Sequence, residues 1–314
     1  MTWSVRRASL HDKPALQGLC RVAVGPDDYV LEGLEDLILR SVVHLATDPE
    51  GRVVGMASYR PLLDGAAWLG QARTHPDYRR QGVARAIIDS FAGLARTSGV
   101  HTLRLWSDAS NEEGVAAFSA AGFKEIARFT RVVGAPARGT PKSKPRGFDE
   151  DLWRRIDRSP IVGKGRRYAS HKWYFLPATR PVVFALAAKG AFHAFGETVI
   201  ALADREDGEE LWFTMWAGDP SEAIEEACRY AHAMGKARVE TFVPHDPGFL
   251  LDARRSGFEP GSWGSEAVLA ELPVAAANPR RRVRPTYREL NARRAGHGHA
   301  HGQSDTLGWA RWNG

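Results

Sequence analysis

The chain has 314 residues, a length that two domains fill comfortably. Hydrophobic residues make up 43% and aromatic residues 10%, enough for ordinary globular cores, and no apolar run reaches the roughly 18 residues of a membrane-spanning helix. The net charge of +6 comes from residues 274–314, where eight arginines face two acids (8 − 2 = +6), so it argues against a folded nucleic-acid-binding face.

The cysteine content excludes two further classes of protein. Only Cys20 and Cys228 occur, without a CxxC partner, which excludes a disulfide framework and a cysteine-rich zinc site. The first residues also lack the apolar segment of a secretory signal. Three alternating histidines near the end (His297, His299 and His301) lack the spacing of a real metal site. We therefore expect a cytoplasmic protein with no membrane contact and no bound metal.

Residues 1–134 predict alternating strands and helices. Apolar residues at helical spacing indicate helices, and β-rich runs between turn residues indicate strands. The expected elements are, in chain order, a strand at 3–8, a helix from Ser9 to the break at Gly25-Pro26, a helix from Asp27 or Asp28, strands at 42–46, 53–58 and 66–74, a helix from Gly82 to Gly99, a strand at 102–106, a helix at 114–121 and a strand at 123–133.

The second half of the chain repeats the pattern of the first. A Gly-led strand and a Gly-Phe pair are 23 residues apart at Gly99 and Gly122, and 22 residues apart at Gly235 and Gly257. The second copy is shorter before its strand, and in its loop Asp219 or Ser221 would cap the next helix, so the loop would not accept phosphate. We expect the following organisation: residues 1–134 a catalytic unit, 135–167 a linker with a short helix, 168–273 a degenerate second unit, and 274–314 a basic, His-containing tail.

The segment from His75 to Arg85 follows a strand and opens a helix. A Gly-containing loop there directs several unpaired N–H groups one way, and the helix dipole behind them favours an anion, most often phosphate. Gly82 permits close approach, and Arg79, Arg80 and Arg85 can add charge-assisted contacts. Taken alone, the segment also fits an ordinary strand–helix turn with solvated arginines.

Two motifs decide between these alternatives. Arg79-Arg80-Gln81-Gly82-Val83-Ala84 resembles the Q/R-x-x-G-x-G/A signature of the GCN5-related N-acetyltransferase (GNAT) superfamily, and Asn111 to Phe123 resembles its second motif. The resemblance implies an α/β (α+β) fold with a mixed, mostly antiparallel sheet flanked by helices, here as two tandem units. It also implies that acetyl-CoA binds between two splayed strands, at Ala72, Arg73, Thr74, Arg79, Arg80, Gln81, Gly82, Val83, Ala84, Arg85, Asn111 and Phe118. A weaker resemblance, around Gly25 to Tyr29, is to the histidine N-acetyltransferase branch.

The catalytic groups are less evident. The family's usual tyrosine, which protonates the leaving thiolate, is replaced by Phe118, and the strand before the loop has no glutamate. Asp28, Tyr29 and Glu32 lie where the family lines its acceptor cleft, and His44 and Asp108 could approach it. Each of these also fits a cap, a surface charge or a satisfied core residue, and we expect His75 to cap the loop.

Acetyl transfer to a primary amine of a small molecule, either an amino-acid-like one or another amine, is therefore the function that the sequence favours. The alternative is a non-catalytic acetyl-CoA sensor or scaffold, as the missing tyrosine and glutamate allow. The second unit would shape the acceptor cleft or form a homodimer surface.

Overall fold

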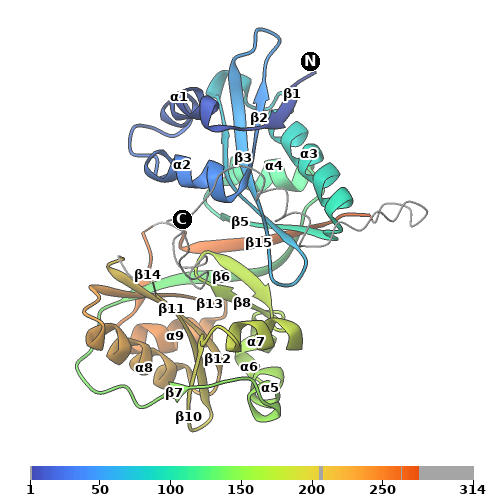
Figure 1. Cartoon of the computed structure of the whole chain (residues 1–314). Helices are drawn as coiled ribbons and strands as arrows, with labels where there is room; N and C mark the ends of the chain where they lie inside the picture. Colours follow the sequence, from blue (N-terminus) through green and yellow to red (C-terminus); the bar gives the residue numbers. More distant parts are fainter. Residues whose placement is uncertain (1, 205–207, 263, 276–314) are drawn as a thin grey trace, which may run out of the picture.

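The computed structural model describes residues 2–204, 208–262 and 264–275. The basic and histidine-containing segment therefore falls almost entirely outside the described residues. In Figure 1 two lobes stand one above the other, each with helices on both sides of its strands. The strands of both lobes join in one 13-stranded sheet, in the order β1-β2-β3-β4-β5-β15-β6-β13-β12-β11-β10-β7, with β14 beside β6.

The first lobe forms from the N-terminal residues, and its boundaries lie close to those expected from the sequence. Its elements are β1 (Ser4–Arg7), η1 (Leu10–Asp12), α1 (Lys13–Ala23), α2 (Val30–Arg40), β2 (Val42–Thr47), β3 (Val53–Pro61), β4 (Ala67–Thr74), η2 (Pro76–Tyr78), α3 (Val83–Ser98), β5 (Thr102–Asp108), α4 (Glu112–Ala120) and β6 (Lys124–Gly134).

Helices cover both faces of this part of the sheet. Leu16, Leu34 and Leu37 of α1 and α2 pack on Leu45 and Met56. On the opposite face, α3 and α4 bury an apolar stripe that includes Val83, Ile87, Phe91 and Phe118. The spacing of the α3 residues, every three to four positions, is what places them on one side of the helix.

The second lobe begins earlier than the sequence suggested. Its elements are β7 (Lys144–Pro145), α5 (Glu150–Asp157), α6 (Pro160–Lys164), β8 (Tyr168–His171), β9 (Tyr174–Pro177), α7 (Arg180–Ala187), β10 (Phe192–Phe195), β11 (Thr198–Asp204), β12 (Glu210–Ala217), α8 (Pro220–Ala233), β13 (Arg238–Pro244), α9 (Pro247–Arg255), β14 (Glu259–Pro260) and β15 (Glu266–Pro273). Strand β7 pairs with β10 at the sheet edge, and Leu152 and Ile156 of α5 join the core of this lobe. Residues 144–164 are therefore part of the second lobe and not a linker.

The two lobes exchange their last strands. Strand β15 leaves the second lobe and lies between β5 and β6, pairing from Ala267↔Asp108 to Pro273↔Thr102 on one side. Strand β6 in turn lies between β13 and β14 of the second lobe. In Figure 1, β15 crosses the waist of the molecule beside β5. The expected boundary at residue 134 separates units in sequence only, because residues 266–273 complete the sheet of the first lobe.

The exchanged strand is buried on both faces. Val268, Leu269 and Ala270 are at most 1% exposed, and Val268 and Ala270 belong to the core under α3. A strand covered on both faces has a continuous apolar run instead of alternation, and this run has that pattern. The first lobe therefore cannot bury its core without residues that lie near the end of the chain.

Candidate functional site

Strands β4 and β5 diverge partway along their length. Their parallel pairing is limited to Ala67↔Leu103 and Trp68↔Arg104, although β4 continues to Thr74 and β5 to Asp108. A bulge in β4 accompanies the divergence: Gln71 has φ +49°, and the register with β3 shifts beside it. The outer halves of both strands thus face an opening that the other strand does not fill. The main chain of Ala72, Arg73 and Thr74 borders this opening and can pair with an extended ligand.

The Gly82 loop lies beyond the outer end of β4, at the start of α3. Gly82 has φ +86°, and an added Cβ would meet only Trp3 Nε1 at an ordinary contact distance of 3.9 Å, so the backbone conformation, not crowding, requires glycine. No side chain caps α3, and within the described residues we find no acceptor for the N–H groups of Val83, Ala84 and Arg85. Three parallel donors at a helix N-terminus form an anion site.

Hydrogen bonds fix the conformation of the rest of the loop. Gln81 donates through Nε2 to the Asp77 carbonyl at 2.7 Å, and its own carbonyl accepts from Trp3 Nε1 at 3.0 Å. Arg80 has φ +58°, a left-handed conformation that turns its exposed side chain outward. His75 Nδ1 accepts from the Asp77 N–H, which confirms its expected capping role. The side chain and carbonyl of Gln81 therefore hold the loop's shape.

Two arginines flank the loop with weak partners. Arg79 makes a 3.5 Å contact with Glu113 and donates to the Ala23 carbonyl at 3.1 Å. Arg85 pairs with Asp89 at 3.0 Å, and its side chain is 57% exposed. Exposed pairs of this kind contribute only about 0–1 kcal/mol, so both guanidinium groups can turn to a phosphate at little cost.

Arg73 and Asp28 form a buried pair instead of serving a ligand and a base. Arg73 Nε and Nη2 donate to the two carboxylate oxygens of Asp28 at 2.7 and 2.6 Å. Burial raises the pKa of Asp28, but the hydrogen bonds from Arg73 and the Val30 N–H outweigh it, so the pKa lies below its ordinary value. A carboxylate held in this way is a poor proton acceptor. The pair ties the α1–α2 connection to β4, which argues against Asp28 as the general base.

Asn111 precedes α4 at the outer end of β5, and Phe118 lies within α4. Asn111 Oδ1 accepts from the Gly114 N–H at 3.0 Å, and its amide donates to Ser107 Oγ at 3.3 Å, so it caps the helix. Phe118 is 6% exposed and meets Phe123 edge-on at 6.2 Å. Neither the capping Asn111 nor the buried Phe118 ring supplies an acidic group to the opening.

The remaining base candidates lie apart from one another. His44 is buried beneath α3, where Nδ1 contacts Ser90 Oγ at 3.0 Å and its ring stacks on Phe91 at 4.5 Å. Burial lowers the pKa of His44, as does the charge of Arg7. Glu32 is exposed on α2, and Asp108 Oδ1 accepts from the N–H and Oγ of Ser110. His44 is thus a satisfied core histidine on the far side of the sheet from α1 and α2.

Tyr29 and a hairpin from the second lobe border the opening on the α1–α2 side of the sheet. The Tyr29 ring lies 5.2 Å from the Arg73 guanidinium and is 41% exposed. Trp106 follows the last paired residue of β5 on that face. Trp173 of the β8–β9 hairpin stacks on Trp106, and Tyr174 of the same hairpin contacts Trp68 of β4. The aromatic run at 173–175 was the available signal in the sequence, but nothing local connected it with β5.

The second lobe has a similar divergence that is filled by its own chain. Strands β12 and β13 pair only from Glu210↔Arg238 to Trp212↔Glu240. Residues of α6 and β8 occupy the space beyond, where Thr214 Oγ1 donates to the Ser170 carbonyl at 2.5 Å, and a residual volume of about 10 Å³ remains. Asp219 accepts from the Glu222 N–H at 3.0 Å, as expected for a cap of α8.

Within the described residues, no helix is long and apolar enough to cross a membrane. The same residues contain no group of three or more histidine, cysteine or acidic side chains that could hold a metal ion.

Comparison with known proteins agrees with this geometry. Residues 17–123 match the sequence model of the acetyltransferase (GNAT) family. The [ribosomal protein bS18]-alanine N-acetyltransferase of Escherichia coli (strain K12) is 35% identical over 75 residues, which are 24% of this chain and 50% of that enzyme. The chain thus spans about half the length of the curated relatives that it matches.

Two solved structures resemble the whole two-lobed fold. A GCN5-related N-acetyltransferase from Sphaerobacter thermophilus superposes with a TM-score of 0.55 at 14% identity, over 88% of this chain and 97% of that one. An acetyltransferase candidate from Thermoplasma acidophilum gives a TM-score of 0.57 at 18% identity, over 86% and 99%. At these identities the likeness concerns the fold alone. Residues 17–123 are thus similar to the GNAT family of acetyltransferases.

Proposed function

We propose that the first lobe binds acetyl-CoA in the opening between β4 and β5 and transfers the acetyl group to a primary amine. The observation that carries this proposal is the divergence after Trp68 and Arg104, with an uncapped helix N-terminus at its mouth. The α3 N–H groups, with Arg79, Arg80 and Arg85, would hold the pyrophosphate. The main chain of Ala72 to Thr74 would pair with the pantetheine arm. GNAT acetyltransferases use acetyl-CoA, which is why the site is assigned to this co-substrate.

The transfer needs little acid–base help from the chain. A main-chain N–H at the β4 bulge would polarise the thioester carbonyl; the amine nitrogen attacks the carbonyl carbon, a C–N bond forms and the C–S bond breaks. A thiol has a pKa of about 8.5, so the thiolate can leave and take up the amine's proton from solvent. This agrees with Phe118 at the position of the family's usual tyrosine.

The acceptor is a narrower part of the proposal. The curated relative acts on an alanine of a ribosomal protein, so the acceptor amine could belong to a protein or to a small molecule. We favour a small molecule because a hairpin of the second lobe lies over the α1–α2 side of the opening. A long peptide would have to pass that hairpin to reach β5.

The second lobe is proposed to be a degenerate GNAT-like unit without a co-substrate. Its strand order, β7-β10-β11-β12-β13, corresponds to the order β1-β2-β3-β4-β5 of the first lobe. The space where β12 and β13 diverge is filled by α6 and β8. Both cysteines are free and buried, which supports the proposed cytoplasmic location. A homodimer surface on this lobe stays a prediction.

Thiol release with acetyl-CoA and a panel of amines tests the enzyme, and calorimetry with CoA tests the site. One equivalent of CoA bound with thiol release is the expected result. Binding without release from any amine would favour the alternative, a sensor or scaffold, to which Phe118 and the arginine-held Asp28 also point. Two equivalents of CoA would contradict the assignment of the second lobe.

A further inference from the structure

The β8–β9 hairpin belongs to the second lobe but contacts the opening in the first. Trp106 Nε1 of β5 donates to the Trp173 carbonyl at 3.0 Å, and the two indole rings stack at 6.0 Å. Tyr174 accepts through its hydroxyl from Arg60 Nη1 of β3 at 2.9 Å and meets Trp68 of β4 edge-on at 5.3 Å. Consecutive residues of one hairpin therefore contact three strands of the other lobe.

The position of these contacts along the strands is specific. Trp68 and Arg104 form the last pair of β4 with β5, and side chains on a strand alternate between faces. Trp106 is therefore the first β5 side chain beyond that pair on the face that carries Arg104. Trp106, Trp173 and Tyr174 are each partly exposed, so the rings keep surface that a ligand can cover.

The carboxylates on this face are mostly occupied. Buried or nearly buried acids are each held by an arginine at 2.6–2.7 Å: Asp28 by Arg73, Asp64 and Glu271 by Arg104, and Glu240 by Arg131. Each ammonium group of a polyamine or an aminoglycoside needs an acceptor, and removing a guanidinium from such a buried pair is costly. Asp108 at the end of β5 differs, because among the described residues its carboxylate accepts hydrogen bonds from Ser110 and from no arginine.

We propose that Trp173 and Tyr174 form the specificity-determining wall of the acceptor site, and that the acceptor is a monoamine with a planar, ring-bearing body. This rests on the proposed acetyl transfer. The ring body lies against Trp106 and Trp173, which offer large, rigid apolar surface. The single ammonium group faces Asp108, a carboxylate at the end of β5 that is hydrogen-bonded by Ser110 and not by an arginine. The second lobe thus selects the acceptor for a reaction carried out in the first.

The test compares acceptors that differ in ring and charge. Thiol release is measured with 2-phenylethylamine, n-butylamine, spermidine and kanamycin for the unmodified chain and for Trp173→Ala, Trp173→Phe and Tyr174→Phe. Phe184→Ala is the control, because Phe184 is an aromatic residue of the same lobe on α7 and is 57% exposed. CoA affinity is measured for every variant, so that a folding defect is recognised.

The unmodified chain is expected to prefer 2-phenylethylamine. Trp173→Ala should raise its KM at least tenfold and that of n-butylamine less, with CoA affinity unchanged within twofold, and Trp173→Phe should restore much of the loss. A preference of the unmodified chain for spermidine or kanamycin would contradict the proposed acceptor site. So would an equal loss of activity with all four amines in Trp173→Ala. Quenching of tryptophan fluorescence by 2-phenylethylamine separates the two proposals. Quenching that is lost in Trp173→Ala, without thiol release from any amine, would support the wall and contradict the transferase.

Discussion

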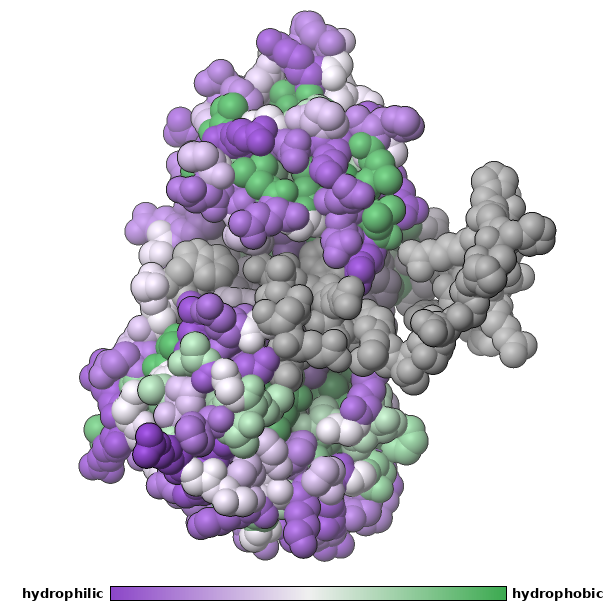
Figure 2. Space-filling view, turned by 60° about the vertical axis from the view of Figure 1, so that its left-hand side comes forward, coloured by the Kyte–Doolittle hydropathy of each residue, from purple (hydrophilic) through white to green (hydrophobic). Residues whose placement is uncertain are grey.

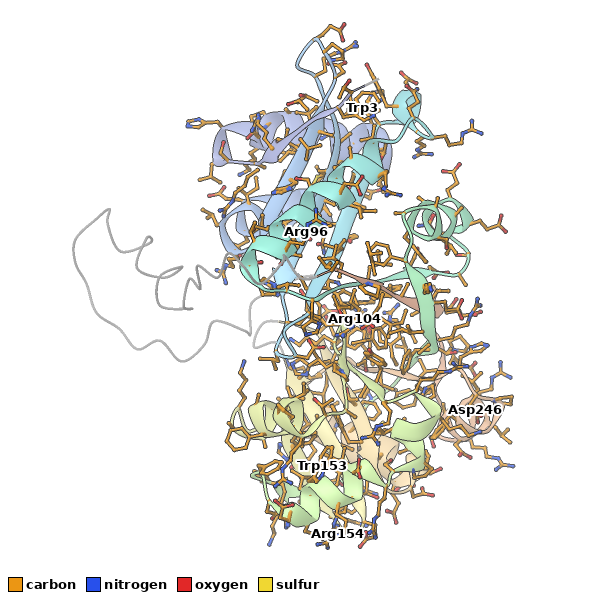
Figure 3. All side chains as sticks on the ribbon, turned by 90° about the vertical axis from the view of Figure 1, so that its right-hand side faces the viewer. Trp3, Arg96, Arg104, Trp153, Arg154 and Asp246 are labelled. Atoms are coloured by element: carbon orange, nitrogen blue, oxygen red, sulfur yellow. The ribbon has the colours of Figure 1, made fainter. Side chains whose placement is uncertain are left out.

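Arg104 and Glu271 lie 167 residues apart in the sequence, and their side chains form a partly buried ion pair at 2.6 Å. Arg104 is 2% exposed and also pairs with Asp64 at 2.7 Å and donates to the Phe175 carbonyl at 3.0 Å. Figure 3 shows it where the two lobes meet. One guanidinium thus joins the β3–β4 turn, the exchanged strand β15 and the β8–β9 hairpin. The face of the two lobes shown in Figure 2 mixes many hydrophilic residues with smaller hydrophobic patches.

Replacing Glu271 with alanine should destabilise the whole chain. The change leaves the buried charge of Arg104 with one partner fewer, and breaking a buried pair costs about 3–5 kcal/mol. Because Glu271 keeps some solvent contact, the lower end of that range is expected. Glu113→Ala is the control: its contact with Arg79 is 3.5 Å long and its side chain 76% exposed, so a change below about 0.5 kcal/mol is expected. Urea unfolding measures both, and equal effects would contradict the role of the pair.

Removal of β15 should unfold the first lobe. Chains that end at residue 135 or at residue 260 lack Val268 and Ala270, which fill the core under α3. We expect both to lose cooperative unfolding and CoA binding, and not to retain them as two independent units would. A chain that ends at residue 275 keeps every described contact and is the control. A stable, CoA-binding fragment 1–135 would show that the exchanged strand is dispensable.

Gly82→Asp should abolish CoA binding, whereas Gly82→Ala should only weaken it. Both substitutions place a side chain at φ +86°, which costs about 1–2 kcal/mol. Only aspartate adds a negative charge where the phosphates approach the α3 N–H groups. Calorimetry should therefore show a loss of more than 100-fold for aspartate and about tenfold for alanine. Equal losses would mean that backbone strain, not charge, explains the requirement for glycine.

Phe118→Tyr should change the acetyl-transfer rate by less than the roughly 100-fold expected of a general acid. The Phe118 ring is buried against Phe123, so a hydroxyl added there finds an apolar surrounding and should lower stability by about 1–3 kcal/mol. Single-turnover kinetics and thermal unfolding separate the two effects. A large gain in rate would show that the missing hydroxyl limits the enzyme.

His171 should make stability depend on pH between about 6.5 and 4. Burial lowers its pKa from 6.5 to about 4, and the charges of Lys172 and Lys189 act in the same direction. The unfolded chain then binds a proton in this range that the folded chain does not. The stabilising effect is complete above pH 6.5 and is lost as the pH falls towards 4. His171→Gln should flatten this part of the unfolding profile by about 1–3 kcal/mol; an unchanged slope would assign it to other groups.

The sequence alone determined the elements of the first lobe and the glycine turn before α3. The helix from Val83 to Ser98 was predictable because its apolar residues recur at helical spacing, and the turn before it because Gly82 is the residue that a left-handed backbone needs. The caps formed by Asp219 and His75 are hydrogen bonds to residues two or three positions away, so a short stretch of sequence contains both partners. These features depend on neighbours within a few residues, so the local sequence is enough to predict them.

Only the tertiary structure decided how the two halves share their sheet. The run Val268-Leu269-Ala270 indicates a buried strand, but it cannot say that its partners are β5 and β6 instead of β13, since the pairing depends on main-chain groups that every residue has. The Asp28–Arg73 pair, which argues against Asp28 as a base, and the position of Trp173 over Trp106 arise in the same way. Such contacts join residues 45 and 67 positions apart. Local sequence contains no physical trace of which distant residue will fill a given space.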